Sequence, residues 1–345
     1  MIHYPPRMSS LPDHVDALIV AQSQPEDRRV FVGRLHPQDL GEGDVTVRVA
    51  WSSVNYKDGL ATLPNGKVAR IDPLVPGVDL SGEVIASDTA EVAVGDQVIA
   101  HAHDLGVAHH GGFAQYARVP AEWIVPLPEG LSLRDAMVLG TAGFTAALSV
   151  HLLEERGLTP GSGSILVTGA TGGVGSTAVD MLAGRGYEVV AATGKAEAHE
   201  YLRTLGATEI VTRDDVVGDA SKPLGKQRWA GAVDCVGGAM LAGILRNLRR
   251  GAAVAASGNT GGMALETNVA PFILRGVALL GVDSVACPRP TRLEVWRRLG
   301  SDLRPRHLDD SIASEVDGLG DGLVAALERV LAGEMTGRTV VRIGA

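Results

Sequence analysis

The sequence predicts an α/β protein in which a doubly wound parallel sheet of six strands is joined to a compact β-rich domain. Three observations support this prediction. An apolar run enters a glycine-rich turn at 164–175, the region after it alternates short apolar strands with helical stretches, and residues 15–135 show short alternating segments separated by turns. At 345 residues the chain exceeds what one core usually accommodates, so two domains are expected.

The β-rich domain is expected over residues 1–135, and residues 284–345 are expected to rejoin it. Its predicted strands are short and alternating, with Gly, Pro and Asp turns between them. These strands are predicted at 17–21, 45–49, 82–86, 97–100 and 114–119. The C-terminal part is predicted to contribute a helix at 291–303 and a strand at 339–343.

The parallel sheet is expected over residues 136–283. The segment 132–153 is typical of a helix, a glycine-containing break and a second helix. Six strands then alternate with helices such as 197–205 and 240–248, and the polar stretch 214–228 is expected to be an exposed loop. The strands are predicted at 164–168, 187–193, 209–211, 230–236, 252–257 and 277–282.

The turn SILVTGATGGVG, residues 164–175, is the most informative part of the sequence. Chain that leaves a parallel strand must reverse tightly, approach phosphate oxygens and open a helix whose free N–H groups face the anion. The fingerprint G-x-G-x-x-G is altered, because Ala170 stands at the first glycine position. A diphosphate site is therefore predicted here, and a glycine-rich loop of another α/β protein is the alternative. The predicted cofactor-binding residues of the turn are Ala170, Thr171, Gly172, Gly173, Val174 and Gly175.

The end of the second predicted strand indicates which nicotinamide cofactor binds. An NAD-binding sheet usually offers Asp or Glu to the ribose about 20 residues past the glycines, but this chain has Thr193, Gly194 and Lys195 there. This position has no carboxylate that would repel a 2′-phosphate. A hydroxyl, a backbone N–H and an ammonium are available there to bind it. We therefore expect NADPH, with Arg213 as a second cation; ordinary surface charge is the alternative for Lys195 and Arg213.

Composition excludes several classes of partner. The net charge is −9 and no basic cluster occurs, so neither nucleic acid nor an anionic membrane is an expected partner, and the ligands should be small molecules. Cys235 and Cys287 are too few for a disulfide framework or a multi-cysteine zinc site. The first fourteen residues contain no signal-like apolar run, which indicates a cytoplasmic protein.

Eight motifs in order resemble one family. The sequence is similar to the zinc-independent medium-chain dehydrogenase/reductases, in the branch of acrylyl-CoA reductases and quinone-oxidoreductase-like proteins. The resemblance covers essentially the whole chain and implies a GroES-like catalytic domain, a Rossmann dinucleotide-binding domain and often a homodimer. The motifs are NYKDGL (55–60), PLVPGVDLSGEV (73–84), VGDQVI (94–99), GGFAQYARVP (111–120), VTGATGGVG (167–175), TGK (193–195), LGVDSV (280–285) and GRTVV (337–341).

The resemblance also shows what the chain lacks. Zinc-dependent relatives carry a Cys near the position of Asn55 and a His-Glu pair after a Pro-Gly, but here Val78 and Asp79 follow Pro76 and Gly77. Hydride transfer without a metal is therefore expected. The competing signal is HAHDLGVAHH at 101–110, whose histidines are expected to be solvated loop residues rather than a metal ligand set.

Without a Lewis acid, the expected reaction is reduction of an activated C=C bond by hydride transfer to its β-carbon. Hydrogen-bond donors would stabilise the charge that develops on the carbonyl oxygen, and a proton must reach the α-carbon. The resemblance implies an acrylyl-CoA-like thioester as the substrate. A quinone or a free enone is the first alternative, and an NADPH-binding redox sensor without turnover is the second.

Candidate catalytic residues lie in NYKD: the Asn55 amide as a donor, the Tyr56 hydroxyl as donor or proton relay, and Asp58 as an orienting or relay group. In relatives Tyr56 approaches the nicotinamide, so it is also a cofactor-binding candidate. The alternative for Asn55 and Asp58 is that they cap a helix that begins near Lys57.

The remaining candidates are less specific. The resemblance implies cofactor contacts for five residues that follow strands or lie near them, although each would also suit packing. Lys67 and Arg70 are expected beside the substrate, where they would bind the phosphates of CoA or simply keep a loop soluble. The five implied cofactor contacts are Ser257, Gly258, Asn259, Ile273 and Ser284.

Overall fold

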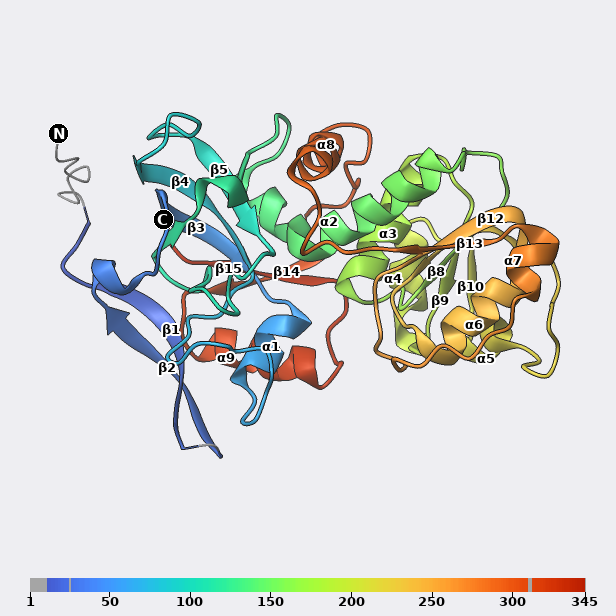
Figure 1. Ribbon diagram of the computed structural model, residues 1–345, viewed down its shortest axis with the longest axis horizontal. Helices are drawn as coiled ribbons and strands as arrows, with labels where there is room; N and C mark the ends of the chain where they lie inside the picture. Colours follow the sequence, from blue (N-terminus) through green and yellow to red (C-terminus); the bar gives the residue numbers. More distant parts are fainter. Residues whose placement is uncertain (1–10, 25, 310–311, 345) are drawn as a thin grey trace. The chain divides into compact units, whose positions relative to one another are not determined.

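The computed structural model describes residues 11–24, 26–309 and 312–344, and it divides into two units (Figure 1). Unit 1 combines residues up to Thr141 with those from Ala313 onward, and unit 2 is Ala142–Ile312. The expected boundaries at 135/136 and 283/284 therefore need correction. Segment 284–312 lies in unit 2, where Arg298 of this segment donates a hydrogen bond of 2.6 Å to the Glu154 carboxylate. Residues 1–10, most of the N-terminal fourteen, lie outside the described residues.

Unit 2 contains a six-stranded parallel sheet in the order β10-β9-β8-β11-β12-β13, which confirms the predicted doubly wound sheet. After β10 the chain returns to place β11 beside β8, so the strand order reverses between β8 and β11. Ligands of such sheets bind outside the carboxyl ends of the strands at this reversal. The strands are β8 (Ile165–Thr168), β9 (Val189–Ala192), β10 (Glu209–Val211), β11 (Trp229–Asp234), β12 (Leu248–Ala256) and β13 (Ala278–Gly281).

The helices of unit 2 include one that the sequence analysis missed. Segment 214–228 was expected to be a loop, but its first residues belong to α5, Arg213–Val217. Thr212 caps this helix: its hydroxyl accepts the Asp215 N–H at 3.2 Å, and the Asp215 carboxylate accepts the Thr212 N–H at 2.9 Å. The other helices are α3 (Gly173–Gly184), α4 (His199–Thr204), α6 (Gly238–Asn247), α7 (Ala270–Arg275) and α8 (Arg289–Leu299).

Unit 1 contains a seven-stranded sheet in the order β14-β15-β3-β4-β5-β7, with β6 paired to β3, and a separate β1–β2 hairpin. All five strands predicted for this part are present. Short β7 and the mostly exposed β2 and β14 lack the apolar pattern that predicts strands. The strands are β1 (Val15–Gln24), β2 (Asp27–Leu35), β3 (Val45–Ser53), β4 (Asp79–Ser87), β5 (Gln97–His101), β6 (Tyr116–Val119), β7 (Ile124–Pro126), β14 (Ala313–Asp317) and β15 (Arg338–Arg342).

Three further α-helices complete the described residues, together with short 3-10 helices at Pro37–Asp39, Ala121–Trp123 and Ala196–Ala198. Unit 1 holds α1 (Tyr56–Thr62) and α9 (Asp321–Leu331), which pack closely at Gly59, where a Cβ would lie 2.8 Å from Leu331 Cγ. The third, α2 (Leu133–Glu155), contains the predicted break, because Gly140 has a φ of +51°. By length and composition α2 is able to span a membrane, but 83% of its apolar window is buried in the structure, as in a core helix.

Candidate functional site

The glycine turn joins β8 to α3 in unit 2, as the sequence predicts. Gly172 is the N-cap residue of α3, so the free N–H groups of the first helical turn begin at Gly173. A Cβ at Gly175 would collide with the carbonyl oxygen of Gly169, so only glycine allows the turn to close this tightly. The N–H of Ala170 bonds the carbonyl of Ala192 at 3.3 Å, which holds the turn beside the end of β9. Thr171 and Val174 occupy the remaining positions of the turn.

A cavity of about 330 Å³ lies beside this turn and brings together residues that the sequence analysis selected separately. Thr193, Gly194 and Lys195 follow β9, and Arg213 is the first residue of α5. The Lys195 N–H donates to the Thr193 hydroxyl oxygen at 3.0 Å, which leaves the hydroxyl proton available as a donor. None of the residues that line this cavity is acidic, so the donor set suits a phosphate. The lining residues are Gly169, Thr171, Ala192, Thr193, Gly194, Lys195, Arg213, Val236 and Met240.

Asp234, at the end of β11, organises the neighbouring strand ends. Its side chain accepts the Thr168 hydroxyl at 2.5 Å and the Gly237 N–H at 2.9 Å, and burial raises its pKa. Its carbonyl accepts the N–H of Ser257 at 2.9 Å, which ties the end of β12 to β11. Gly258 is required there because a Cβ would collide with the carbonyl of Cys235. Asp234 cannot be recognised from the sequence, since a carboxylate at a strand end belongs to no motif.

The other candidates of unit 2 differ in their exposure. The Asn259 side chain is exposed and donates to the Met263 sulfur at 2.7 Å. Ile273 lies on α7 with 72% of its surface exposed. Ser284 is half-buried after β13, and its carbonyl accepts the Arg292 guanidinium at 3.3 Å. Their predicted cofactor contacts therefore remain predictions.

In unit 1, the NYKD motif forms the beginning of α1. Asp58 is fully buried, and its carboxylate accepts the N–H groups of Asn55 at 2.8 Å, Gly77 at 3.1 Å and Val78 at 2.9 Å. Burial, followed by the negative charge of Asp79, raises the pKa of Asp58 to about 7, against the opposing effect of these hydrogen bonds. Asp58 thus caps the helix and fixes the Pro-Gly turn before β4.

A second buried carboxylate, Asp79, completes a polar network around Asn55. Asp79 accepts the Ser53 hydroxyl at 2.6 Å and the Asn55 amide at 2.8 Å. Thr141 donates both its N–H and its hydroxyl to Asp79, and a side chain at Gly140 would collide with this carboxylate. The break in α2 therefore exists where the helix meets Asp79.

Arg338 supplies the positive charge of this network. Its guanidinium donates to the Ser53 hydroxyl at 2.9 Å and to the Asn55 side-chain oxygen at 3.2 Å, and it lies 3.9 Å from Asp79. Burial lowers the pKa of Arg338, and the charges of Asp79 and Asp58 oppose this shift. Asp79 and Arg338 belong to the motifs PLVPGVDLSGEV and GRTVV, but only the fold brings them to Asn55.

Tyr56 and the two expected substrate cations lie at the surface of unit 1. Tyr56 is the first residue of α1, and 50% of its surface is exposed. Asn55 and Asp58, on either side of it in the NYKD motif, are held by hydrogen bonds. Lys67 is exposed, whereas the Arg70 guanidinium pairs with Asp104 at 3.3 Å. Part of the positive charge of this loop is thus neutralised within the protein.

The histidines of 101–110 are packed rather than simply solvated, which corrects the expectation. His101 is buried at the end of β5, and the rings of His103 and His109 contact Trp123 with centroids 5.1 and 5.2 Å apart. Burial lowers the pKa of His110. Within residues 11–24, 26–309 and 312–344, no three His, Cys, Asp or Glu side chains are grouped so that they would hold a metal.

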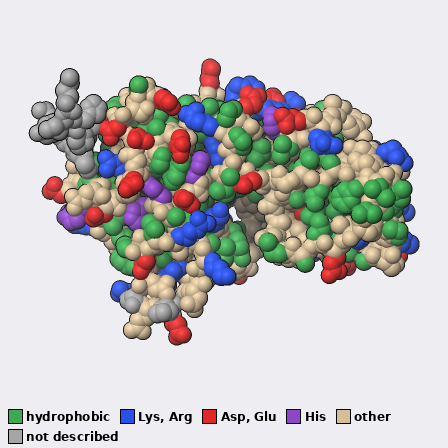
Figure 2. All heavy atoms as spheres, viewed as in Figure 1, with side chains coloured by type: hydrophobic (Ala, Val, Ile, Leu, Met, Phe, Trp, Pro, Cys, Tyr) green, Lys and Arg blue, Asp and Glu red, His purple; other side chains and the backbone are tan. Residues whose placement is uncertain are grey.

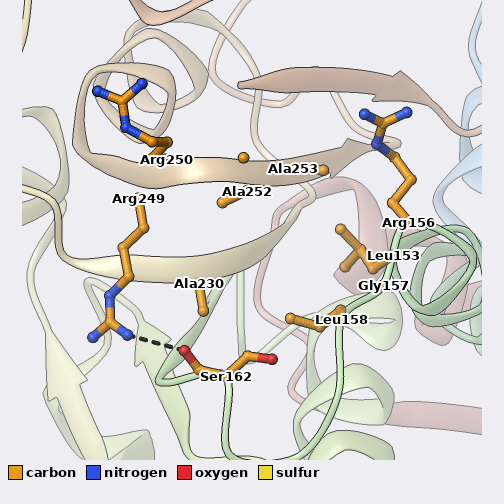
Figure 3. Close-up of a pocket in the computed structure, with 11 residues that line it drawn as sticks. Leu153, Arg156, Gly157, Leu158, Ser162, Ala230, Arg249, Arg250, Ala252 and Ala253 are labelled. Carbon is orange, nitrogen blue, oxygen red and sulfur yellow. Dashed lines mark hydrogen bonds between the residues drawn. The ribbon is translucent and has the colours of Figure 1, made fainter. Parts of the chain in front are cut away.

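A second cavity of unit 2, about 220 Å³, lies at the opposite ends of the strands, where β11 and β12 begin (Figure 3). Arg156, Arg249 and Arg250 contribute to its lining, and Arg249 donates to the Ser162 carbonyl at 3.0 Å. Figure 3 shows the three guanidinium groups at separate corners, pointing in different directions. None of the candidate residues lies here, so this cavity is not part of the candidate site.

Comparisons with known proteins agree with this architecture. Residues 41–129 match the family described as the alcohol dehydrogenase GroES-like domain, and residues 173–301 match the family described as zinc-binding dehydrogenase. The chain is 48% identical over 335 residues to the acrylyl-CoA reductase AcuI of Ruegeria pomeroyi, which covers 96% of this chain and 99% of the relative.

Two solved structures extend the comparison. The Bacillus subtilis protein yhfP with NAD bound is 49% identical, with a TM-score of 0.92 and coverage of 96% of this chain and 99% of that one. The name of the B. subtilis protein assigns it to the quinone oxidoreductases. The yhdH oxidoreductase of Salmonella enterica in complex with NADP is 46% identical, with a TM-score of 0.91 and coverage of 95% and 100%.

A GroES-like unit and a parallel dinucleotide sheet with a glycine turn together define the dehydrogenase class of this chain. Within that class, the chain belongs to the medium-chain dehydrogenase/reductase family, in the branch of the acrylyl-CoA reductases and quinone-oxidoreductase-like proteins.

Proposed function

We propose that this protein is an NADPH-dependent reductase of activated C=C bonds, with an acrylyl-CoA-like 2-enoyl thioester as substrate and no metal in the reaction. The observation that supports NADPH as the cofactor is the cavity beside the glycine turn. Thr193, Lys195 and Arg213 line this cavity, and none of its lining residues is acidic. The relative from S. enterica binds NADP in its solved structure, and the relative from R. pomeroyi is named as an acrylyl-CoA reductase.

The residues of the glycine turn would hold the diphosphate of NADPH, and Thr193, Lys195 and Arg213 would hold its 2′-phosphate. When bound, this cofactor supplies a hydride to an electron-poor carbon. The contacts at the ends of β12 and β13 and on α7 stay part of this proposal: Ser257, Gly258, Asn259, Ile273 and Ser284.

Tyr56 is the proposed donor to the substrate. Its side chain is half exposed, whereas the Asn55 amide already donates to Asp79 and its oxygen accepts from Arg338. Asp58 is completely buried, and its carboxylate already accepts three backbone N–H groups of the protein. We therefore assign Asn55 and Asp58 the task of fixing Tyr56 at the start of α1, in place of a direct donor or relay role.

The thioester is proposed over a quinone because the exposed Lys67 offers positive charge to the phosphates of CoA, beside Arg70, which shares its charge with Asp104 at 3.3 Å. The decisive experiment follows NADPH absorbance with acrylyl-CoA, a small free enone and a quinone in parallel, with and without a chelator. We expect the highest kcat/KM for acrylyl-CoA and no effect of the chelator. A higher kcat/KM for the quinone would favour the alternative suggested by the name of the B. subtilis relative. Binding of NADPH without turnover of any of the three would favour the redox sensor.

We also propose a homodimer of a cytoplasmic protein. Exposed apolar side chains gather on and near α7, where Val269 is 66%, Ile273 72% and Leu274 54% exposed. Hydrophobic atoms gather over the α7 end of unit 2 in Figure 2. Among the described strands, β13 pairs on one side only, so it is an edge for a second copy. Sedimentation at several concentrations tests the dimer.

A further inference from the structure

The loop that carries Lys67 and Arg70 is held at its beginning by one side chain from the β1–β2 hairpin. Arg28, on β2, donates from Nη1 to the carbonyl oxygens of Ala61 at 3.0 Å and Leu63 at 2.9 Å. These carbonyls belong to the last turn of α1 and the residue after it, which have no intrahelical partners. A guanidinium is also favourable at this position because a helix C-terminus carries partial negative charge.

The same hairpin holds the end of the loop. The backbone N–H of Gln22, on β1, donates to the Asp72 carboxylate at 2.9 Å. Two residues away, Val20 and Leu74 exchange backbone hydrogen bonds of 2.8 and 2.9 Å. Arg28 joins the two anchor points, because its Nη2 donates to the Gln22 side-chain oxygen at 2.8 Å.

The loop between the two anchor points begins with a tight turn at Leu63–Gly66, and the position of Lys67 depends on this turn. Leu63 O accepts both the Arg28 guanidinium and the N–H of Gly66, so the first turn of the loop is built on the carbonyl that Arg28 holds. A Cβ at Gly66 would lie only 2.8 Å from the Leu60 carbonyl oxygen, so the turn packs directly on α1. Displacement of Leu63 would therefore move Lys67 and loosen α1, on which Tyr56 lies.

We propose that Arg28 is a positioning residue that sets the affinity for the acyl-CoA substrate, by fixing the end of α1 and the loop 64–73 against the β1–β2 hairpin; this inference rests on the proposed function. The planar guanidinium serves two carbonyls and one amide oxygen from two nitrogens, an arrangement that a single ammonium nitrogen reproduces only in part. Arg28→Lys is thus expected to keep part of the anchoring of the loop 64–73 and of the substrate affinity, and Arg28→Ala is expected to lose this anchoring.

The experiment compares Arg28→Ala and Arg28→Lys with the matched control Arg29→Ala. Arg29 is the next residue of β2 and is exposed, with its guanidinium 6.0 Å from the Phe31 ring centre. Loss of a hydrogen bond to a charged group corresponds to about a tenfold change, so we expect the KM for acrylyl-CoA to rise about tenfold in Arg28→Ala and less in Arg28→Lys. The Kd for NADPH, measured by fluorescence titration, should equal that of the wild type in all three variants.

Hydrogen exchange followed by mass spectrometry provides a readout that does not need turnover. Peptides that cover residues 56–74 should exchange faster in Arg28→Ala than in the wild type, while Arg29→Ala should match the wild type. An unchanged KM for acrylyl-CoA in Arg28→Ala, unchanged exchange in these peptides, or an equal rise of KM in Arg29→Ala would overturn the inference. If the wild type fails to reduce acrylyl-CoA, the proposed function fails and the substrate-affinity role of Arg28 fails with it; faster exchange in Arg28→Ala would then show only that Arg28 anchors the loop. If Arg28→Ala does not fold, Arg28→Lys supplies both measurements.

Discussion

A rise in pH should destabilise the protein through Asp58. The pKa of this buried carboxyl is about 7, against the ordinary value of 3.8 for an exposed aspartate. The folded state therefore binds one more proton than the unfolded state between these two values, and the free energy of unfolding falls as the pH rises through this range. This sign is opposite to that of a carboxylate whose pKa is lowered by a salt bridge.

The size of the effect follows from the two pKa values. One pKa unit corresponds to about 1.4 kcal/mol, so the full difference is worth about 4 kcal/mol. Between about pH 5 and about pH 8, the contribution of Asp58 falls by about 3 kcal/mol, because the folded carboxyl loses its proton in this interval while the unfolded one has already lost it.

Urea unfolding at a series of pH values measures this contribution when the wild type is compared with Asp58→Asn. In the variant, the free energy of unfolding should lack this part of the pH dependence. The uncharged amide of the variant changes that free energy by the same amount at every pH. Burial lowers the pKa of His110 and gives a slope of opposite sign, but it does so in both proteins and cancels in the difference. Asp88→Asn, at an exposed carboxyl of the same unit, should keep the wild-type pH dependence. Parallel curves for the wild type and Asp58→Asn would refute the reasoning.

Three further predictions concern the site. Lys195→Asp should reduce the preference for NADPH over NADH by about ten- to a hundredfold in kcat/KM, because one or two hydrogen bonds to a charged phosphate are lost; an unchanged ratio would contradict the cofactor assignment. Tyr56→Phe should lower kcat by about a hundredfold or more if the hydroxyl takes part in proton transfer, and steady-state kinetics with wild-type kcat would remove Tyr56 from the reaction. Arg338→Ala should destabilise the protein by about 3–5 kcal/mol, since it removes the buried guanidinium that lies 3.9 Å from the buried Asp79 side chain, and thermal unfolding indistinguishable from the wild type would contradict that account.

The sequence predicted those elements whose local pattern is compatible with only one kind of structure. The run that enters the turn at 164–175 predicts a strand, a phosphate-binding turn and a helix, and β8 and α3 follow this order. Gly140 broke α2 as predicted, because a left-handed residue interrupts a helix wherever it occurs. Strand β2 was missed, since most of its residues are exposed and no alternating apolar pattern identifies it.

Nothing local in the sequence relates Asp58, Asp79 and Arg338, which are separated by up to 280 residues along the chain. The fold brings them together, and only their burial in one polar network raises the pKa of Asp58 and commits the Asn55 amide to the protein. The sequence by itself determined the two kinds of domain, the glycine turn and the residue types that suit a 2′-phosphate, because these depend on neighbours in the chain. The tertiary structure alone decided which polar groups are exposed to a substrate and which hold the others in place, because burial and hydrogen-bond partners depend on residues distant in the sequence.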